Sequence, residues 1–277
     1  MKKSLTLLVC VFCFATICDT AVAQSDDEYH PFLSDRFNIG IGLFYPQKSI
    51  TLRVDGSLPE DEIDLDKALK MNESETTAIM EFRWRFGEKW SLWAQYWDVN
   101  STGKAVLEED IEWEDVVFQE GSFVSGGVDL SVARLYFGRT FYTRPGQEFG
   151  LGAGVHWMEL GAFLEGQVLT NMGDTEFYRG NVSADVPLPN LGAWYHFSWH
   201  PKWVLQTRID WLSVSIGDYS GSLWDAQAGV NWQFSKYVGL GLYYQAFRLD
   251  VDVDSSGWHG KAELDQHGPI LSLSGSW

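Results

Sequence analysis

Two short motifs near the end of the sequence carry residue types that hydrolytic chemistry uses. Asp250 and Asp252 stand two positions apart, and Asp265 and His267 repeat this spacing further along. A spacing of two places both members on one face of a strand. Paired carboxylates raise the pKa of one member, and an Asp beside a His orients a base toward water. On neighbouring strands the motifs would form a candidate hydrolytic site at a barrel rim; otherwise the four residues are solvated rim charges next to a strand bulge at Gly268-Pro269.

A second set of candidates lies inside segments that otherwise alternate between apolar and small residues. Enclosed charges must pair and hydrogen-bond to be tolerated. We therefore expect a polar network that fills an interior, with a narrow conduit for ions or small solutes as the alternative. Within it, His156 and His196 are the imidazoles to inspect, with a hydrogen-bonding role favoured over catalysis, and we predict neither metal nor cofactor. The expected members are Glu81, Arg83, Arg85, Arg134, His156, His196, Arg208, Asp210, Asp225 and Arg248.

Strands must position these residues, because hydrophobicity alternates with a period of two along much of the chain. Trp224 to Phe234, for example, sets Trp, Ala and Val against Asp225, Gln227 and Asn231. The apolar faces end in Trp or Tyr, and the polar faces mix Gly with charged residues. This pattern favours strands with lipid on the apolar side, whereas a soluble sandwich or periplasmic barrel would bury that side. The alternating segments are 37–45, 78–86, 90–96, 128–142, 149–157, 191–199, 203–211, 224–234, 238–244 and 264–277.

The connections predict the number of strands. Four links are short, at 86–90, 143–147, 200–203 and 235–237. They join eight strands in pairs, and the first and last strands bring the total to ten. Longer links are expected near 57–74, 103–126, 166–184, 216–222 and 254–262. The predicted fold is therefore an all-β, transmembrane, antiparallel up-and-down barrel of about ten strands with both termini in the periplasm.

The start of the chain indicates export. Residues 1–23 combine a basic start, an apolar core and the small residues Ala21-Val22-Ala23, as a secretory signal peptide does. All three cysteines lie within it. We expect a short periplasmic tail at 24–36 and the barrel at 37–277. With 20 basic and 38 acidic residues, the formal net charge of −18 excludes nucleic acid as a plausible partner.

The last segment, LDQHGPILSLSGSW, ends at Trp277 and resembles the C-terminal strand that the barrel-assembly machinery of Gram-negative bacteria recognises, although Gly275 stands where a bulky apolar residue is usual. From Asp218 onward the chain resembles the C-terminal half of proteobacterial outer-membrane barrels with no assigned activity. Asp250, Asp252, Asp265 and His267 resemble the Asp pair and Asp–His pair of the omptin proteases, which are also ten-stranded barrels. In omptins these pairs face each other across the mouth, whereas here they would lie on adjacent strands.

These observations lead us to expect a monomeric protein of the outer membrane that contacts lipid and lipopolysaccharide. Its external loops are acidic; they are expected to be solvated, with calcium or magnesium shared with lipopolysaccharide phosphates as the alternative. Three function classes stay open: an envelope or interaction barrel with a filled lumen, a narrow porin-like channel, and a rim hydrolase that acts on peptide or lipid A. The loop acids are Glu60, Asp61, Glu62, Asp64, Asp66, Glu108, Glu109, Asp110, Glu112 and Glu114.

Overall fold

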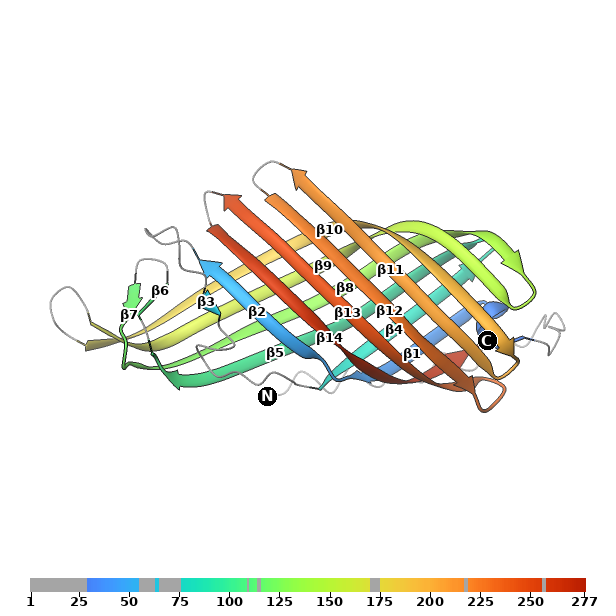
Figure 1. The fold of residues 1–277 in the computed structure, drawn as a ribbon, viewed down its shortest axis with the longest axis horizontal. Coiled ribbons are helices and arrows are strands. Elements are labelled where there is room, and N and C mark those ends of the chain that lie inside the picture. Colours follow the sequence, from blue (N-terminus) through green and yellow to red (C-terminus); the bar gives the residue numbers. More distant parts are fainter. Residues whose placement is uncertain are drawn as a thin grey trace, which may run out of the picture.

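A computed structural model describes residues 29–54, 63–64, 76–108, 110–113, 116–169, 175–216, 219–255 and 258–277. Ten long antiparallel strands form a sheet that closes on itself (Figure 1). They are β1 (Phe37–Phe44), β4 (Thr77–Phe86), β5 (Trp90–Val106), β8 (Phe123–Arg144), β9 (Gln147–Leu169), β10 (Thr175–His200), β11 (Trp203–Ile216), β12 (Tyr219–Gln233), β13 (Val238–Ser255) and β14 (Trp258–Ser276). The last pairs with the first, which confirms the predicted ten-stranded up-and-down barrel. Among the described residues, no helix is long and apolar enough to cross a membrane.

The closing strand β14 is longer than β1 and has a second partner beyond it. β2 (Gln47–Val54) continues β1 and pairs with β14 from His267 back to Gly260. Between the two paired stretches, Tyr45 donates its N–H to Pro269 O at 3.0 Å. A Cβ on Gly268 would lie 2.1 Å from the Tyr45 carbonyl oxygen, so only glycine fits this crossing. The two-residue strand β3 (Ile63–Asp64) extends β2.

The outside of the barrel carries an apolar belt between two aromatic girdles. On β11 and β12 the girdles are marked by Trp203 and Trp211, and by Trp232 and Trp224, which are all exposed. Eight residues separate the members of each pair, which corresponds to about 27 Å along a strand and about 21 Å across a bilayer at a tilt of about 40°. This height matches the apolar band of outer-membrane barrels. Further exposed members of the external girdle are Tyr45, Tyr96, Trp157 and Tyr244.

The hydrophobic pattern inverts where the strands pass the external girdle. From Val124 to Thr140 of β8 the even positions face inward: Arg134 and Tyr136 lie within the membrane zone, while Val128, Leu130 and Val132 lie beyond it. The outward positions change in the opposite sense, because Leu135 and Phe137 give way to polar Asp129 and Ser131. Water outside the membrane favours polar outer faces and an apolar interior. The external half of the barrel is therefore a hydrophobic core.

Strands replace most of the external loops that the sequence indicates. The links expected at 166–184, 216–222 and 254–262 are largely taken up by the ends of β9, β10, β11, β12, β13 and β14, and the link expected at 103–126 is shortened at both ends by β5 and β8. Figure 1 shows these strands projecting far from the short turns. A small hairpin of β6 (Ile111–Trp113) and β7 (Val116–Phe118) lies between β5 and β8. This prediction was wrong because polar outer faces in water were interpreted as loops. Of the predicted segments, the signal peptide 1–23, tail residues 24–28 and the loop acids Glu60, Asp61, Glu62, Asp66, Glu109 and Glu114 lie outside the described residues.

The described part of the N-terminal tail enters the periplasmic end of the barrel. A short 3₁₀ helix, Pro31–Leu33, begins after His30, whose side chain accepts a hydrogen bond from the Phe32 N–H. His30 and Phe32 are both buried. The His30 N–H donates to Ser198 Oγ on β10 at 2.9 Å, which ties the segment to the wall. We call residues 29–36 the plug segment.

Candidate functional site

A layer of paired charges crosses the middle of the barrel, and we call it the ion-pair layer. Arg134 comes from β8, Arg208 and Asp210 from β11, and Asp225 from β12. Asp210 and Asp225 are direct register partners, so their buried carboxylates lie side by side. Arg134 binds Asp210 through Nε–Oδ2 and Nη2–Oδ1 contacts of 2.5 and 3.0 Å. Arg208 Nη1 lies 3.1 Å from Asp210 and 2.8 Å from Asp225, so two guanidinium groups neutralise the two carboxylates.

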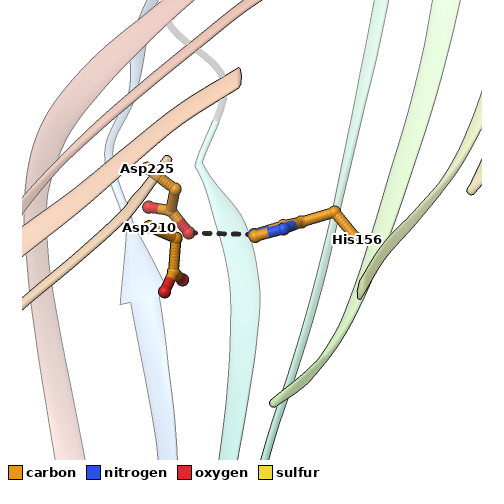
Figure 2. Close-up of side chains that lie close together, drawn as sticks. All are labelled: His156, Asp210 and Asp225. Carbon is orange, nitrogen blue, oxygen red and sulfur yellow. Dashed lines mark hydrogen bonds and ion pairs between the residues drawn. The ribbon is translucent and has the colours of Figure 1, made fainter. Parts of the chain in front are cut away.

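His156 approaches this layer from β9. Figure 2 shows its imidazole pointing across the interior toward Asp225 and Asp210. Its Nε2 lies 3.4 Å from Asp225 Oδ2, and the residue is fully buried. Nδ1 has no hydrogen-bond partner among the described residues. The carboxylate therefore fixes the ring, as it would for a base, but the site lies inside the packed interior and not at a rim.

Side-chain amides extend the ion-pair layer to the opposite wall. Gln245 Nε2 donates to Asp225 Oδ1 at 2.9 Å. Arg208 donates to Gln227 Oε1 at 3.0 Å and to Gln95 Oε1 at 2.7 Å. The same two amides donate from Nε2 to Glu81 Oε1, at 3.1 and 2.8 Å. Because Gln95 belongs to β5 and Gln227 to β12, the network reaches across the bore.

The cluster of His156, Asp210 and Asp225 also has the residue types of a metal site, with one ligand atom of each within 4.8 Å of the others. However, both oxygens of Asp210 already accept hydrogen bonds from Arg134. Asp225 likewise accepts from Arg208 and Gln245. A divalent cation would have to displace these donors and lie beside two guanidinium charges. The donor set fits an ion-pair network better than a metal centre.

A second polar layer closes the periplasmic end. Arg85 Nη2 lies 2.7 Å from Glu148 Oε2, and Trp194 Nε1 donates to Glu148 Oε1 at 3.0 Å. The Arg83 guanidinium lies 3.7 Å above the centre of the Phe32 ring and donates to the Phe32 carbonyl. Phe32 meets the His196 ring edge-on, with 4.9 Å between the ring centres. The plug segment is thus held by cation–π and aromatic contacts as well as hydrogen bonds.

Between the two polar layers lies a small cavity of about 40 Å³, lined by residues that include Glu81, Arg83 and Arg208. It has room for a water molecule or a few. Beyond the ion-pair layer, toward the outside, the interior is apolar, with Trp97, Met158 and Phe247 among its buried members. Side chains therefore fill the described bore at three successive levels.

Nine of the ten predicted lumen residues face the interior, namely Glu81, Arg83, Arg85, Arg134, His156, His196, Arg208, Asp210 and Asp225. His156 and His196 do not meet, because in the register of β9 and β10 they pair with Leu188 and Glu148, respectively. The prediction for Arg248 was wrong. It is exposed on the outer face of β13, opposite Trp224 of the external girdle. There the strand leaves hydrocarbon, so an outward charge is tolerated.

The four rim candidates also lie on the outer surface rather than around the barrel mouth. Asp265 is the register partner of Arg248. His267 Nδ1 lies 2.8 Å from the Tyr244 hydroxyl, so its polar partner is a phenol and not a carboxylate. Asp250 lies 4.0 Å from Lys261 Nζ, and Asp252 faces outward on the same strand. The omptin-like arrangement of two facing pairs is therefore not formed.

Sequence reasoning placed Gln227 on a polar face but left it, with three other residues that complete the polar interior, out of the predicted network. Glu148, Gln95, Gln227 and Gln245 share the inward positions of their strands with the predicted charges. Their alternation with Leu or aromatic neighbours was sufficient to find them. Phe32 carried no such signal, because the polar tail around it has no periodicity.

No family model and no curated protein matches the sequence. Among solved structures, the toluene transporter TodX of Pseudomonas putida is similar with a TM-score of 0.40 and 9% identity, over 89% of this chain and 91% of that chain. The outer membrane protein OprG of Pseudomonas aeruginosa gives 0.38 and 11%, over 91% and 98%. Ail, the attachment invasion locus protein of Yersinia pestis, gives 0.33 and 10%, over 86% and 98%. Values this low say nothing about a shared activity.

The location follows from the barrel itself. A closed sheet leaves no unpaired edge between the girdles, and its outer face there is apolar and aromatic. Only a bilayer satisfies such a surface, and antiparallel barrels with an even number of strands are the spanning form of the bacterial outer membrane. The chain is a Gram-negative outer-membrane β-barrel protein.

Proposed function

We propose that this protein is a non-conducting envelope barrel. It acts through contacts that the surface of its external half makes, and it does not pass solutes. The observation that carries the proposal is the filling of the bore. The plug segment, the ion-pair layer and the apolar core follow one another along the axis, and each is made of buried side chains.

The ion-pair layer is the strongest obstacle to conduction. Arg208 alone contacts Asp210, Asp225, Gln95 and Gln227. Opening a water path here would break charge-assisted hydrogen bonds and separate buried charges, which costs several kcal/mol. Ions would then have to cross the apolar core, whose mostly hydrophobic side chains are poor substitutes for their hydration shell.

Planar-bilayer recording tests the proposal. Purified protein is added at increasing concentration, and insertion is verified in the same lipid by protection of the belt from protease. We expect no discrete conductance steps above background. Steps that increase with protein concentration, and that change size in Arg208→Gln but not in the surface variant Arg139→Gln, would show a conducting lumen and reject the proposal.

The rim-hydrolase alternative receives no support from the geometry, since His267 contacts Tyr244 rather than an Asp. Peptide and lipid A cleavage should accordingly be equal for the wild type and His267→Ala. A rate that falls in the variant would restore that alternative.

A further inference from the structure

The belt has a groove on its outer face where β10 to β13 run side by side. Its volume is about 470 Å³. Bulky side chains border the groove, including Phe149 and Tyr195 on one side and Tyr244 on the other. The outward side chains at its floor are small: Ala193, Thr207, Ala226, Ala228 and Ala246.

The groove lies within the membrane zone, and Ile209 and Ala226 of its lining are next to the external girdle. On the outer face of β11, Ile209 is followed by the girdle residue Trp211. On the outer face of β12, Ala226 is preceded by the girdle residue Trp224. This part of the wall faces hydrocarbon, so the acyl chains of the surrounding lipids are available to occupy the groove. The small floor residues let such a chain approach the wall more closely than the surrounding belt does.

A cation stands at the external end of the groove. Arg248 is the next outward-facing residue after Ala246 and is the register partner of Trp224. It is exposed, and no described residue forms a hydrogen bond or ion pair with its guanidinium. At this level, lipid headgroups replace hydrocarbon, and a guanidinium is suited to bind a phosphate through two oxygens.

We propose that the groove and Arg248 form a binding site for lipid A, with one acyl chain in the groove and a phosphate on the guanidinium. The polarity of the site agrees with the external leaflet, in which the headgroup lies outside and the chain points toward the membrane centre. The carboxylates of Asp250 and Asp265 flank Arg248. Binding is therefore measured with Mg²⁺ present, which carboxylate and phosphate oxygens share and which offsets their repulsion.

The test measures lipid A bound per barrel in nanodiscs, by mass spectrometry, over a titration of lipid A in phosphatidylcholine with Mg²⁺. Two variants address the two halves of the site. Arg248→Gln removes the cation, and Ala226→Leu with Ala228→Leu fills the groove with apolar side chains that suit a lipid-facing wall. Arg248→Gln should weaken binding about tenfold, because it removes a charge-assisted hydrogen bond to the phosphate. The double leucine variant should weaken binding by a similar factor, because the acyl chain can no longer enter the groove.

Matched controls keep the test specific. Arg139→Gln removes an exposed outward arginine at the other girdle, and Ala133→Leu enlarges an outward alanine of β8 away from the groove. Both should bind lipid A like the wild type. Equal binding by all variants, or equal competition by phosphatidylglycerol, would overturn the proposal. This inference rests only on the outer-membrane location, so a conducting lumen would leave it untouched.

Discussion

Phe37 and Trp277 exchange both of their backbone hydrogen bonds, with N···O distances of 2.9 and 3.1 Å, and their rings stack with centres 5.8 Å apart. These two residues close the barrel at its periplasmic end. Stacked aromatic pairs contribute about 0.5–1.5 kcal/mol beyond the area that they bury.

The first prediction concerns this closure. In a double-mutant cycle of Phe37→Ala and Trp277→Ala, the two changes should couple by about 0.5–1.5 kcal/mol, because each ring loses the other as a partner. Urea unfolding in lipid vesicles measures the free energies. Strictly additive losses would mean that the stack does not stabilise the closed form.

The second prediction concerns Arg208. Replacing it by Leu leaves Asp225 buried without its cation and should destabilise the barrel by about 3–5 kcal/mol. Arg139→Leu is the matched control: this arginine lies on the outer face beside Trp90 and Phe141, where leucine suits the belt, so its effect should stay within about 1 kcal/mol. If both variants unfold at the same urea concentration, the ion-pair layer does not hold the barrel together.

The third prediction concerns the fit of Trp194 against the wall. A Cβ on Gly150 would lie 2.0 Å from the Trp194 ring, whereas a Cβ on Gly161 of the same strand would be 3.8 Å from its nearest neighbour. Gly150→Ala should therefore cost about 1–3 kcal/mol by overpacking, and Gly161→Ala should be neutral or slightly stabilising. Adding Trp194→Leu to Gly150→Ala should recover part of the loss. If the double variant recovered no stability, the loss in Gly150→Ala would not come from contact with the Trp194 ring.

The fourth prediction concerns pH and the plug segment. Burial, with a smaller contribution from the positive charge of Arg83, lowers the pKa of His30 from its ordinary 6.5 to about 4. The docked segment therefore holds a neutral imidazole that a released segment would protonate below about 6.5. Docking should weaken progressively as the pH falls from about 6.5 to 4. Hydrogen exchange of residues 29–36, corrected for the intrinsic rate, reports this release.

The design of this experiment must account for Asp35, whose pKa burial raises, so that its protonation at low pH favours docking. An Asp35→Asn background removes that opposing contribution. Within it, His30→Gln should show protection that no longer depends on pH between 4 and 7. A pH dependence that persists in His30→Gln would assign the effect to another group.

Within the membrane zone, the sequence alone was sufficient to predict which side chains of the barrel wall face inward and which face outward. A strand between lipid and lumen alternates strictly, so the parity of Trp224 and Ala226 places Asp225 inside without further information. The same reasoning did not extend past the girdle. Arg248 shares the outward parity of Leu242 and Tyr244, yet its charge suggested an interior place, because the sequence does not mark the depth at which the outside changes from hydrocarbon to water.

Other features depend on contacts between distant segments, which no local pattern contains. Asp210 and Asp225 are recognisable as inward residues, but their side-by-side position depends on the register in which β11 pairs with β12. The bond between Arg134 and Asp210 spans the bore between strands that are not neighbours in the sheet. The entry of Phe32 was likewise invisible, since the pocket that receives it is built by Arg83, Trp93 and His196 from three different strands.

The reversal of polarity along β8 sets the height at which this protein rests in the bilayer. A shift of two residues toward the cell would carry Asp129 and Ser131 toward hydrocarbon, and a shift the other way would lift Leu135 into water. Since neighbouring strands change character at the same level, every strand opposes such sliding at once. The external half is thus held at a constant height above the membrane surface.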